Sequence, residues 1–217
     1  MASGRFISNS NNHLKKTLTL SLRNNFLLSK WQQHQVADYI IRHFINPQLG
    51  SRKKEYNARK LVGYSMEQMY TVVSDVEKYK EFLPFCNKSD IIVRRDDFLK
   101  ANLAIGFPPI HERYTSSVTL RRPYLVQAVC TDGKLFDYLE TAWKFMPGLK
   151  SNEQSCVIDF AVSFQFRSLL YSQLSHLFFD QLVKQMEKAF ITEAQRRYGK
   201  PTTKVIQLSS MVETSKM

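Results

Sequence analysis

The five histidines are the side chains best suited to proton transfer or metal binding, and their spacing supports neither role. They are His13, His34, His43, His111 and His176. None lies in an HExxH motif, and the sequence contains no GxSxG motif, no P-loop and no glycine-rich dinucleotide turn. His111 precedes Glu112 in a predicted strand, where neighbouring residues point to opposite faces, so the two do not form a catalytic pair. The sequence therefore predicts that the protein is not an enzyme.

The cysteines offer no metal site or disulfide either. Cys86, Cys130 and Cys156 are far apart and show no CxxC spacing. We expect each to be a small core residue in a reducing compartment.

Glu112 is a charged residue that the strand pattern turns inward, because it shares a face with Ile110 and Tyr114. A buried carboxylate is costly unless it is paired or hydrogen-bonded. We expect it to meet a basic side chain or the polar head of a ligand. A salt bridge at the rim of a cavity is the structural alternative.

Large apolar side chains occupy the inward positions of the predicted strands and of the last helix. On the strands they are Phe107, Tyr114, Trp143, Phe145, Phe164 and Phe166. On the helix they are Leu174, Phe178, Phe179 and Leu182. Each alone is compatible with core packing, whereas the set favours a long apolar slot for a hydrophobic ligand. We therefore predict that these residues and Glu112 bind the ligand.

Most of the elements that position these residues are strands. A short strand is predicted at residues 56–62, and Ser65 with Gln68 forms a capping box that starts a helix. A short helix or turn follows through residues 79–85. Alternating apolar residues then predict strands at residues 99–107, 110–120, 125–131, 134–145 and 156–167. The pair Asp132-Gly133 predicts a tight two-residue hairpin.

A long amphipathic helix at about residues 169–198 ends the domain, and Gly199 and Pro201 stop it. This order predicts an α+β domain in which an antiparallel sheet curls around a long C-terminal helix and leaves an internal apolar cavity. The order resembles the helix-grip fold of the START and polyketide-cyclase superfamily.

The 217-residue chain has a net charge of +12, and most of that charge lies at its front end. Residues 1–60 hold eleven Lys or Arg and only two acidic residues, of which Asp38 comes first. The acid-free start, rich in Ser, Thr and Asn, is typical of a mitochondrial transit peptide, with a disordered basic tail as the alternative. We assign residues 1–50 to a transit peptide and linker, 51–201 to a START-like lipid-binding domain and 202–217 to a polar tail.

Two apolar loops are predicted to contact a membrane: Leu83 with Phe85, and Pro108 with Pro109. Packed turns are the alternative. No apolar run approaches the roughly 20 residues of a membrane span, so we expect any membrane association to be peripheral.

Four runs of sequence are similar to those of the mitochondrial coenzyme Q-binding START-domain proteins. They are VVSDVEKYKEFLPFC at 72–86, GFPP at 106–109 with ERYTS at 112–116, TDGKLF at 131–136 and FQFRS at 164–168. The resemblance covers about residues 52–200. It implies a protein that binds coenzyme Q (ubiquinone) as a ligand, requires no cofactor, and serves as a chaperone or carrier for respiration, with help in quinone biosynthesis as a further role. It also implies a peripheral location on the matrix side of the mitochondrial inner membrane, near respiratory complexes or quinone-biosynthesis enzymes.

Two other functions remain open. The same superfamily hosts cyclase and aromatase enzymes, and fold does not fix function. Such an enzyme needs converging polar groups, and the inward set offers little beyond Glu112 and Tyr114. Overall charge also suggests a ribosome- or nucleic-acid-binding protein, but the net charge of +3 after residue 60, without a basic stripe, argues against it.

Overall fold

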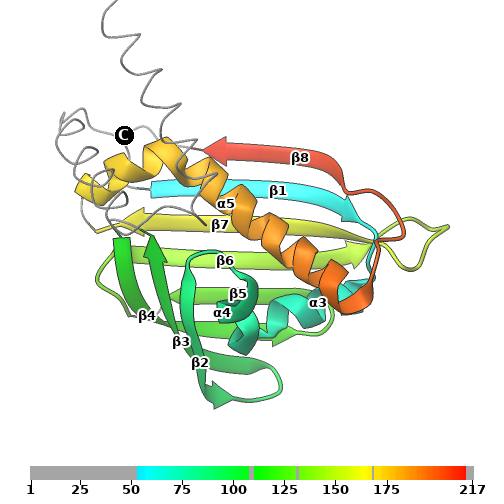
Figure 1. Ribbon diagram of the computed structural model, residues 1–217, viewed down its shortest axis with the longest axis horizontal. Helices are drawn as coiled ribbons and strands as arrows, with labels where there is room; N and C mark the ends of the chain where they lie inside the picture. Colours follow the sequence, from blue (N-terminus) through cyan, green and yellow to red (C-terminus); the bar gives the residue numbers. More distant parts are fainter. Residues whose placement is uncertain (1–52, 108–109, 131, 168, 214–217) are drawn as a thin grey trace, which may run out of the picture. The chain divides into compact units, whose positions relative to one another are not determined.

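Alternating apolar and polar residues build most of the domain into one antiparallel sheet (Figure 1). The computed structural model describes residues 53–107, 110–130, 132–167 and 169–213, within which the sheet has eight strands. In chain order they are β1 (Lys53–Val62), β2 (Cys86–Arg94), β3 (Phe98–Phe107), β4 (Ile110–Arg121), β5 (Leu125–Cys130), β6 (Phe136–Pro147), β7 (Cys156–Phe166) and β8 (Ile206–Glu213). Across the sheet the order is β2-β3-β4-β5-β6-β7-β1-β8. The predicted transit peptide and linker at residues 1–50 lie outside the described residues.

The strands form where apolar and polar residues alternate, because one face of the sheet is buried. β7 shows this most regularly, since buried and half-buried residues alternate along its whole length. Figure 1 shows β2, β3 and β4 turned away from the direction of the other strands, so the sheet curls. A curled sheet surrounds whatever packs on its inner face.

The helices pack on this inner face. They are α3 (Met66–Ser74), the short α4 (Tyr79–Phe82), preceded by a 3-10 turn (Val76–Lys78), and α5 (Leu169–Tyr198). The ring of Trp143 contacts Phe190 of α5 at 4.7 Å between centroids, and the ring of Phe145 contacts Tyr70 of α3 at 6.3 Å. Because Trp143 and Phe145 are two residues apart on β6, they point to the same face, so α3 and α5 cover the same side of the sheet. The predicted α+β fold is confirmed.

The start of α3 forms as the capping box predicts. The Ser65 hydroxyl accepts a hydrogen bond from the amide of Gln68 at 3.2 Å, and the Gln68 side chain accepts one from the amide of Ser65 at 2.9 Å. These bonds satisfy two of the amides that a helix start leaves without partners. Within the described residues, no helix combines the length and the hydropathy needed to span a membrane.

Charged side chains hold α5 in place at two positions. Glu187, only 2% exposed, accepts hydrogen bonds from Lys60 at 2.8 Å and from the Tyr56 hydroxyl at 3.3 Å, both on β1. Near the end of the helix, Arg197 bridges Glu193 at 2.7 Å and Asp75, just after α3, at 2.9 Å. These pairs fix the helix against both β1 and α3.

The predicted two-residue hairpin at Asp132-Gly133 is wrong. β5 ends at Cys130 and β6 begins at Phe136, so a five-residue connection joins them. The Asp132 carboxylate accepts hydrogen bonds from the amide and the hydroxyl of Thr115 on β4, the latter at 2.9 Å. The Asp132 side chain therefore fastens a longer loop to a neighbouring strand. Gly133 still supplies a positive φ, at +153°.

Two strands are absent from the sequence prediction. β2 is interrupted by register shifts between Cys86 and Lys88 and between Ile91 and Val93, which break the alternation that identifies a strand. β8 lies within the segment assigned to a polar tail. Its first five side chains are all exposed, so this part of the strand has no buried face, and backbone pairing with β1 holds it.

The end of α5 provides a test of these charge interactions. Hydrogen bonds from Arg196 lower the pKa of Glu193 below its ordinary value of about 4.5, with burial opposing and Arg197 assisting the shift. A carboxyl group whose pKa is lowered by folding stabilises the fold fully at pH values above its ordinary pKa. This stabilisation is lost as the pH falls through the lowered pKa of the folded state. We expect Glu193→Gln to reduce the free energy of unfolding by roughly 1–3 kcal/mol at pH 7 and by much less at pH 3.

Urea unfolding at the two pH values measures this difference. Glu153→Gln is the matched control, because Glu153 is exposed. An equal loss of stability at both pH values would contradict the assignment of the effect to the Glu193 charge.

Candidate functional site

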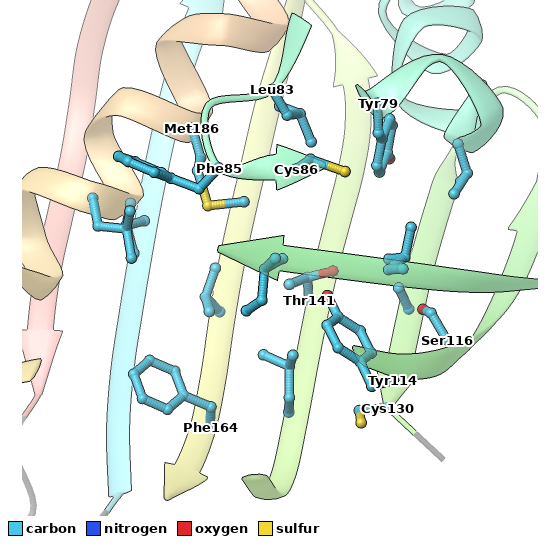
Figure 2. A pocket seen from close by; sticks show the side chains of 18 of the residues that line it. Tyr79, Leu83, Phe85, Cys86, Tyr114, Ser116, Cys130, Thr141, Phe164 and Met186 are labelled. Carbon is cyan, nitrogen blue, oxygen red and sulfur yellow. The ribbon is translucent and has the colours of Figure 1, made fainter. Parts of the chain in front are cut away.

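An apolar cavity of about 180 Å³ lies between the inner face of the sheet and the helices α4 and α5 (Figure 2). Strands β3 to β7 form its floor. The segment from Tyr79 to Cys86 forms one wall, and Leu182, Val183, Met186 and Phe190 of α5 cover it. None of the described lining residues carries a formal charge.

The cavity exists because small side chains separate two aromatic clusters. Along β6 and β7, Trp143 stacks on Phe160 at 4.1 Å in one cluster, and Phe136 stacks on Phe166 at 5.3 Å in the other. Between them on the floor, Ala128 pairs with Thr141 of β6. The Trp143 ring, which contacts Phe190 of α5, holds the helix away from the sheet, while the small residues leave the space below unfilled.

Several predicted ligand residues line this cavity. They are Tyr114, Trp143, Phe164, Phe166 and Leu182. Phe145 does not: it is 2% exposed and packs against Tyr70, because α3 covers the end of β6 where it lies. Phe107, Leu174, Phe178 and Phe179 lie in described strands or helices, but the structure does not describe their side chains.

Glu112 does not line the cavity. Its carboxylate accepts a hydrogen bond from the backbone amide of Lys134 at 3.1 Å. The structure thus gives it a backbone donor in the β5–β6 connection rather than the predicted basic side chain or ligand head. Glu112 orients this loop.

The structure describes one of the two loops that were predicted to contact a membrane. Leu83 is only 8% exposed and lines the cavity together with Phe85 (Figure 2). Phe85 has a φ of +68°, and its carbonyl accepts a hydrogen bond from the amide of Gly106 at 2.9 Å. Leu83 thus packs in the domain as in the packed-turn alternative, while its contact with a membrane stays a prediction. Pro108 and Pro109 lie outside the described residues.

Sequence reasoning missed several lining residues. Ser116 and Thr141 are polar, yet they follow the same two-residue spacing as Tyr114 and Trp143, so the strand pattern could have identified them. Tyr79 and Cys86 come from the turn around α4, where no periodic pattern marks an inward side chain.

The titratable groups of the cavity are neutral. Burial raises the pKa of the Tyr79 and Tyr114 hydroxyls far above the usual range for tyrosine. Burial also raises the pKa of the Cys86 and Cys130 thiols, which donate to the carbonyl oxygens of Lys88 at 3.5 Å and Asp132 at 2.8 Å. The thiols are therefore protonated at neutral pH, and the cavity suits a neutral apolar molecule.

Residues 62–191 match the model of the family described as polyketide cyclase / dehydrase and lipid transport. The chain belongs to this family. The match includes α3, α4, β2 to β7 and the part of α5 that covers the cavity.

Similar proteins confirm the predicted resemblance. The chain is 48% identical over 162 residues to the mitochondrial coenzyme Q-binding protein COQ10 homolog B of Xenopus laevis. It is 51% identical over 161 residues to the mitochondrial coenzyme Q-binding protein COQ10 of Drosophila melanogaster. Each match covers 73% of this chain and 66% of the relative, just under two thirds of its length.

Less similar proteins have other names. The chain is 31% identical to the ribosome association toxin RatA of Escherichia coli (strain K12), over 64% of this chain and 85% of that protein. Among solved structures, the Zhui aromatase/cyclase from Streptomyces superposes with a TM-score of 0.57 at 14% identity, covering 67% of this chain and 95% of that one. At that identity the likeness establishes the fold alone.

A larger side chain at the centre of the floor should close the cavity. We expect Ala128→Phe to place its ring in the roughly 180 Å³ space and to abolish binding of the uncharged dye Nile red, which fluoresces in apolar sites. Since the ring fills existing space, stability should change by less than about 1.5 kcal/mol.

Dye titration and thermal melting of the full chain measure both effects. Ala142→Phe, at a half-buried position on the opposite face of β6, is the matched control. Unchanged dye binding in Ala128→Phe would mean that the dye binds elsewhere.

Proposed function

We propose that the protein binds coenzyme Q in this cavity and acts as a lipid chaperone or carrier rather than as an enzyme. The observation that carries the proposal is a neutral, apolar cavity in a chain that is about half identical to named coenzyme Q-binding proteins. Among its described lining residues there is no carboxylate, histidine or lysine that could act as a general base at neutral pH. The cyclase alternative therefore has little support.

The size of the cavity suggests which part of the ligand it holds. An engineered apolar cavity of about 150 Å³ in another protein binds benzene, so a cavity of about 180 Å³ has room for a six-membered ring. It is smaller than the roughly 300–1,000 Å³ of common ligand pockets. In our proposal the quinone ring occupies the cavity and the isoprenoid tail extends beyond it.

We further propose a location on the matrix side of the mitochondrial inner membrane, where the protein supplies coenzyme Q to respiratory complexes or quinone-biosynthesis enzymes. The mitochondrial names of the relatives and the acid-free composition before Asp38 support the mitochondrial assignment. A carrier of so apolar a molecule needs access to a bilayer, which supports peripheral membrane association.

Lipid extraction from the purified full chain tests the ligand. We expect mass spectrometry to detect coenzyme Q in the wild type and in Ala142→Phe, and to find it lost from Ala128→Phe, because only the last change fills the cavity. A wild-type protein without quinone would refute the proposal. Equal quinone in Ala128→Phe would place the ligand outside the cavity, and co-sedimentation with ribosomes instead of quinone would favour a function related to RatA.

A reporter fusion tests the location. Residues 1–50 joined to a fluorescent protein should direct it to mitochondria, because basic, acid-poor leaders drive import. A fusion in which Arg5, Lys15, Lys16 and Arg23 are replaced by Gln keeps the apolar residues and should remain in the cytosol. Cytosolic fluorescence from the unaltered fusion would contradict the transit-peptide assignment.

A further inference from the structure

Three hydroxyl groups interrupt the apolar lining of the cavity. Tyr114 and Ser116 come from β4 and Thr141 comes from β6, and Figure 2 shows all three among the side chains around the space. The hydroxyl of Tyr79, which also lines the cavity, already has a partner, because it donates to the carbonyl of Val73 at 2.5 Å. The thiols of the two lining cysteines bond backbone carbonyls, as described above.

Within the described part of the chain, none of these three hydroxyls has a side-chain or backbone hydrogen-bond partner. The residue Ser116 is nevertheless only 3% exposed. No fully covered side-chain oxygen or nitrogen of the described residues lacks a partner, so the three oxygens are open to the cavity rather than sealed in the core. Buried hydroxyls without partners are costly, and this cost is relieved when a ligand supplies the missing bonds.

The strand register brings the three hydroxyls to one region of the floor. Tyr114 and Ser116 are two residues apart and share a face of β4. On β5, Ala128 pairs with Val118 on one side and with Thr141 on the other. Ser116 itself pairs with Cys130, the next inward position of β5, so the small side chains of Ala128 and Cys130 stand between Ser116 and Thr141. A flat ring lying over Ala128 would have hydroxyl groups on two of its sides.

We propose that Tyr114, Ser116 and Thr141 bind the ring oxygens of the oxidised quinone, an inference that rests on the proposed function. The carbonyl and methoxy oxygens of such a ring only accept hydrogen bonds, and hydroxyls donate them. The high pKa of Tyr114 keeps its hydroxyl protonated at physiological pH. The isoprenoid tail has no polar atoms and lies along apolar residues such as Phe164 and Leu182.

The same chemistry excludes the commonest competing lipids. A fatty acid or phospholipid would place an anionic group in the cavity, and a buried anion needs a cationic partner. The described lining residues include no Lys, Arg or His. A neutral head with several acceptors fits this site best.

Removal of the hydroxyls alone tests the assignment. The variants are Tyr114→Phe, Ser116→Ala and Thr141→Val, singly and together, with Ser117→Ala on the opposite face of β4 as the matched control. Decylubiquinone is the probe, and quenching of Trp143, which lines the same cavity, reports its binding to the full chain. Dye binding and thermal melting without quinone check that the cavity and the fold remain.

We expect the dissociation constant for decylubiquinone to rise about fivefold for each hydroxyl removed, and by on the order of 100-fold in the triple variant. The control should bind as the wild type does. Without quinone, melting temperatures should stay the same or rise, because none of the three hydroxyls has a hydrogen-bond partner in the protein to lose.

The outcomes separate this inference from the proposed function. If the wild type binds quinone and the triple variant binds it equally well, the hydroxyl site is refuted while the quinone function stands. If the variants bind less quinone but also melt at lower temperatures, the hydroxyls hold the fold together and the inference is overturned. If the wild type binds no decylubiquinone, both fail.

Discussion

The contact between α5 and the aromatic residues of β6 and β7 is the interaction on which the rest of the structure depends. Phe190 packs against Trp143, which in turn stacks on Phe160. These large rings set the distance between helix and sheet. Because the floor beside them is built from Ser116, Ala128 and Thr141, the same distance that packs the rings well leaves a void elsewhere.

Charged side chains anchor α5 above the cavity. A helix above a void buries less apolar surface than one above a filled core, so other interactions must hold it. Glu187 meets Lys60 and Tyr56 on β1, and Arg197 joins Glu193 to Asp75. All of these groups stand outside the lining of the cavity, so α5 is anchored by charge while the site itself stays neutral.

Much of the fold and of the cavity lining could be predicted from the sequence. Burial of one face makes apolar residues recur every second position in a strand and about every 3.6 positions in a helix. The period identified β3, β4, β6, β7 and α5, and it placed Tyr114, Trp143, Phe164 and Phe166 at the cavity. It failed where side chains follow other rules. Bulges obscured β2, and β8 has no buried face in its first five residues. Asp132 bonds to the neighbouring strand β4 instead of making a tight turn. Phe145 and Glu112 lie on the strand faces that the pattern predicts. Only the fold shows that α3 packs beside Phe145 and that a loop amide donates to Glu112.

The place of β1 in the sheet has a consequence for how the domain folds. This first strand, residues 53–62, pairs with β7 at residues 156–166 and with β8 at residues 206–213, all near the other end of the chain. Contacts between residues so far apart in sequence form late, because the intervening chain must first be ordered. The meander of β2 to β7 is local and assembles early, leaving its apolar inner face uncovered until β1 and α5 arrive. A chain made from its N-terminus must therefore be nearly complete before its cavity can close.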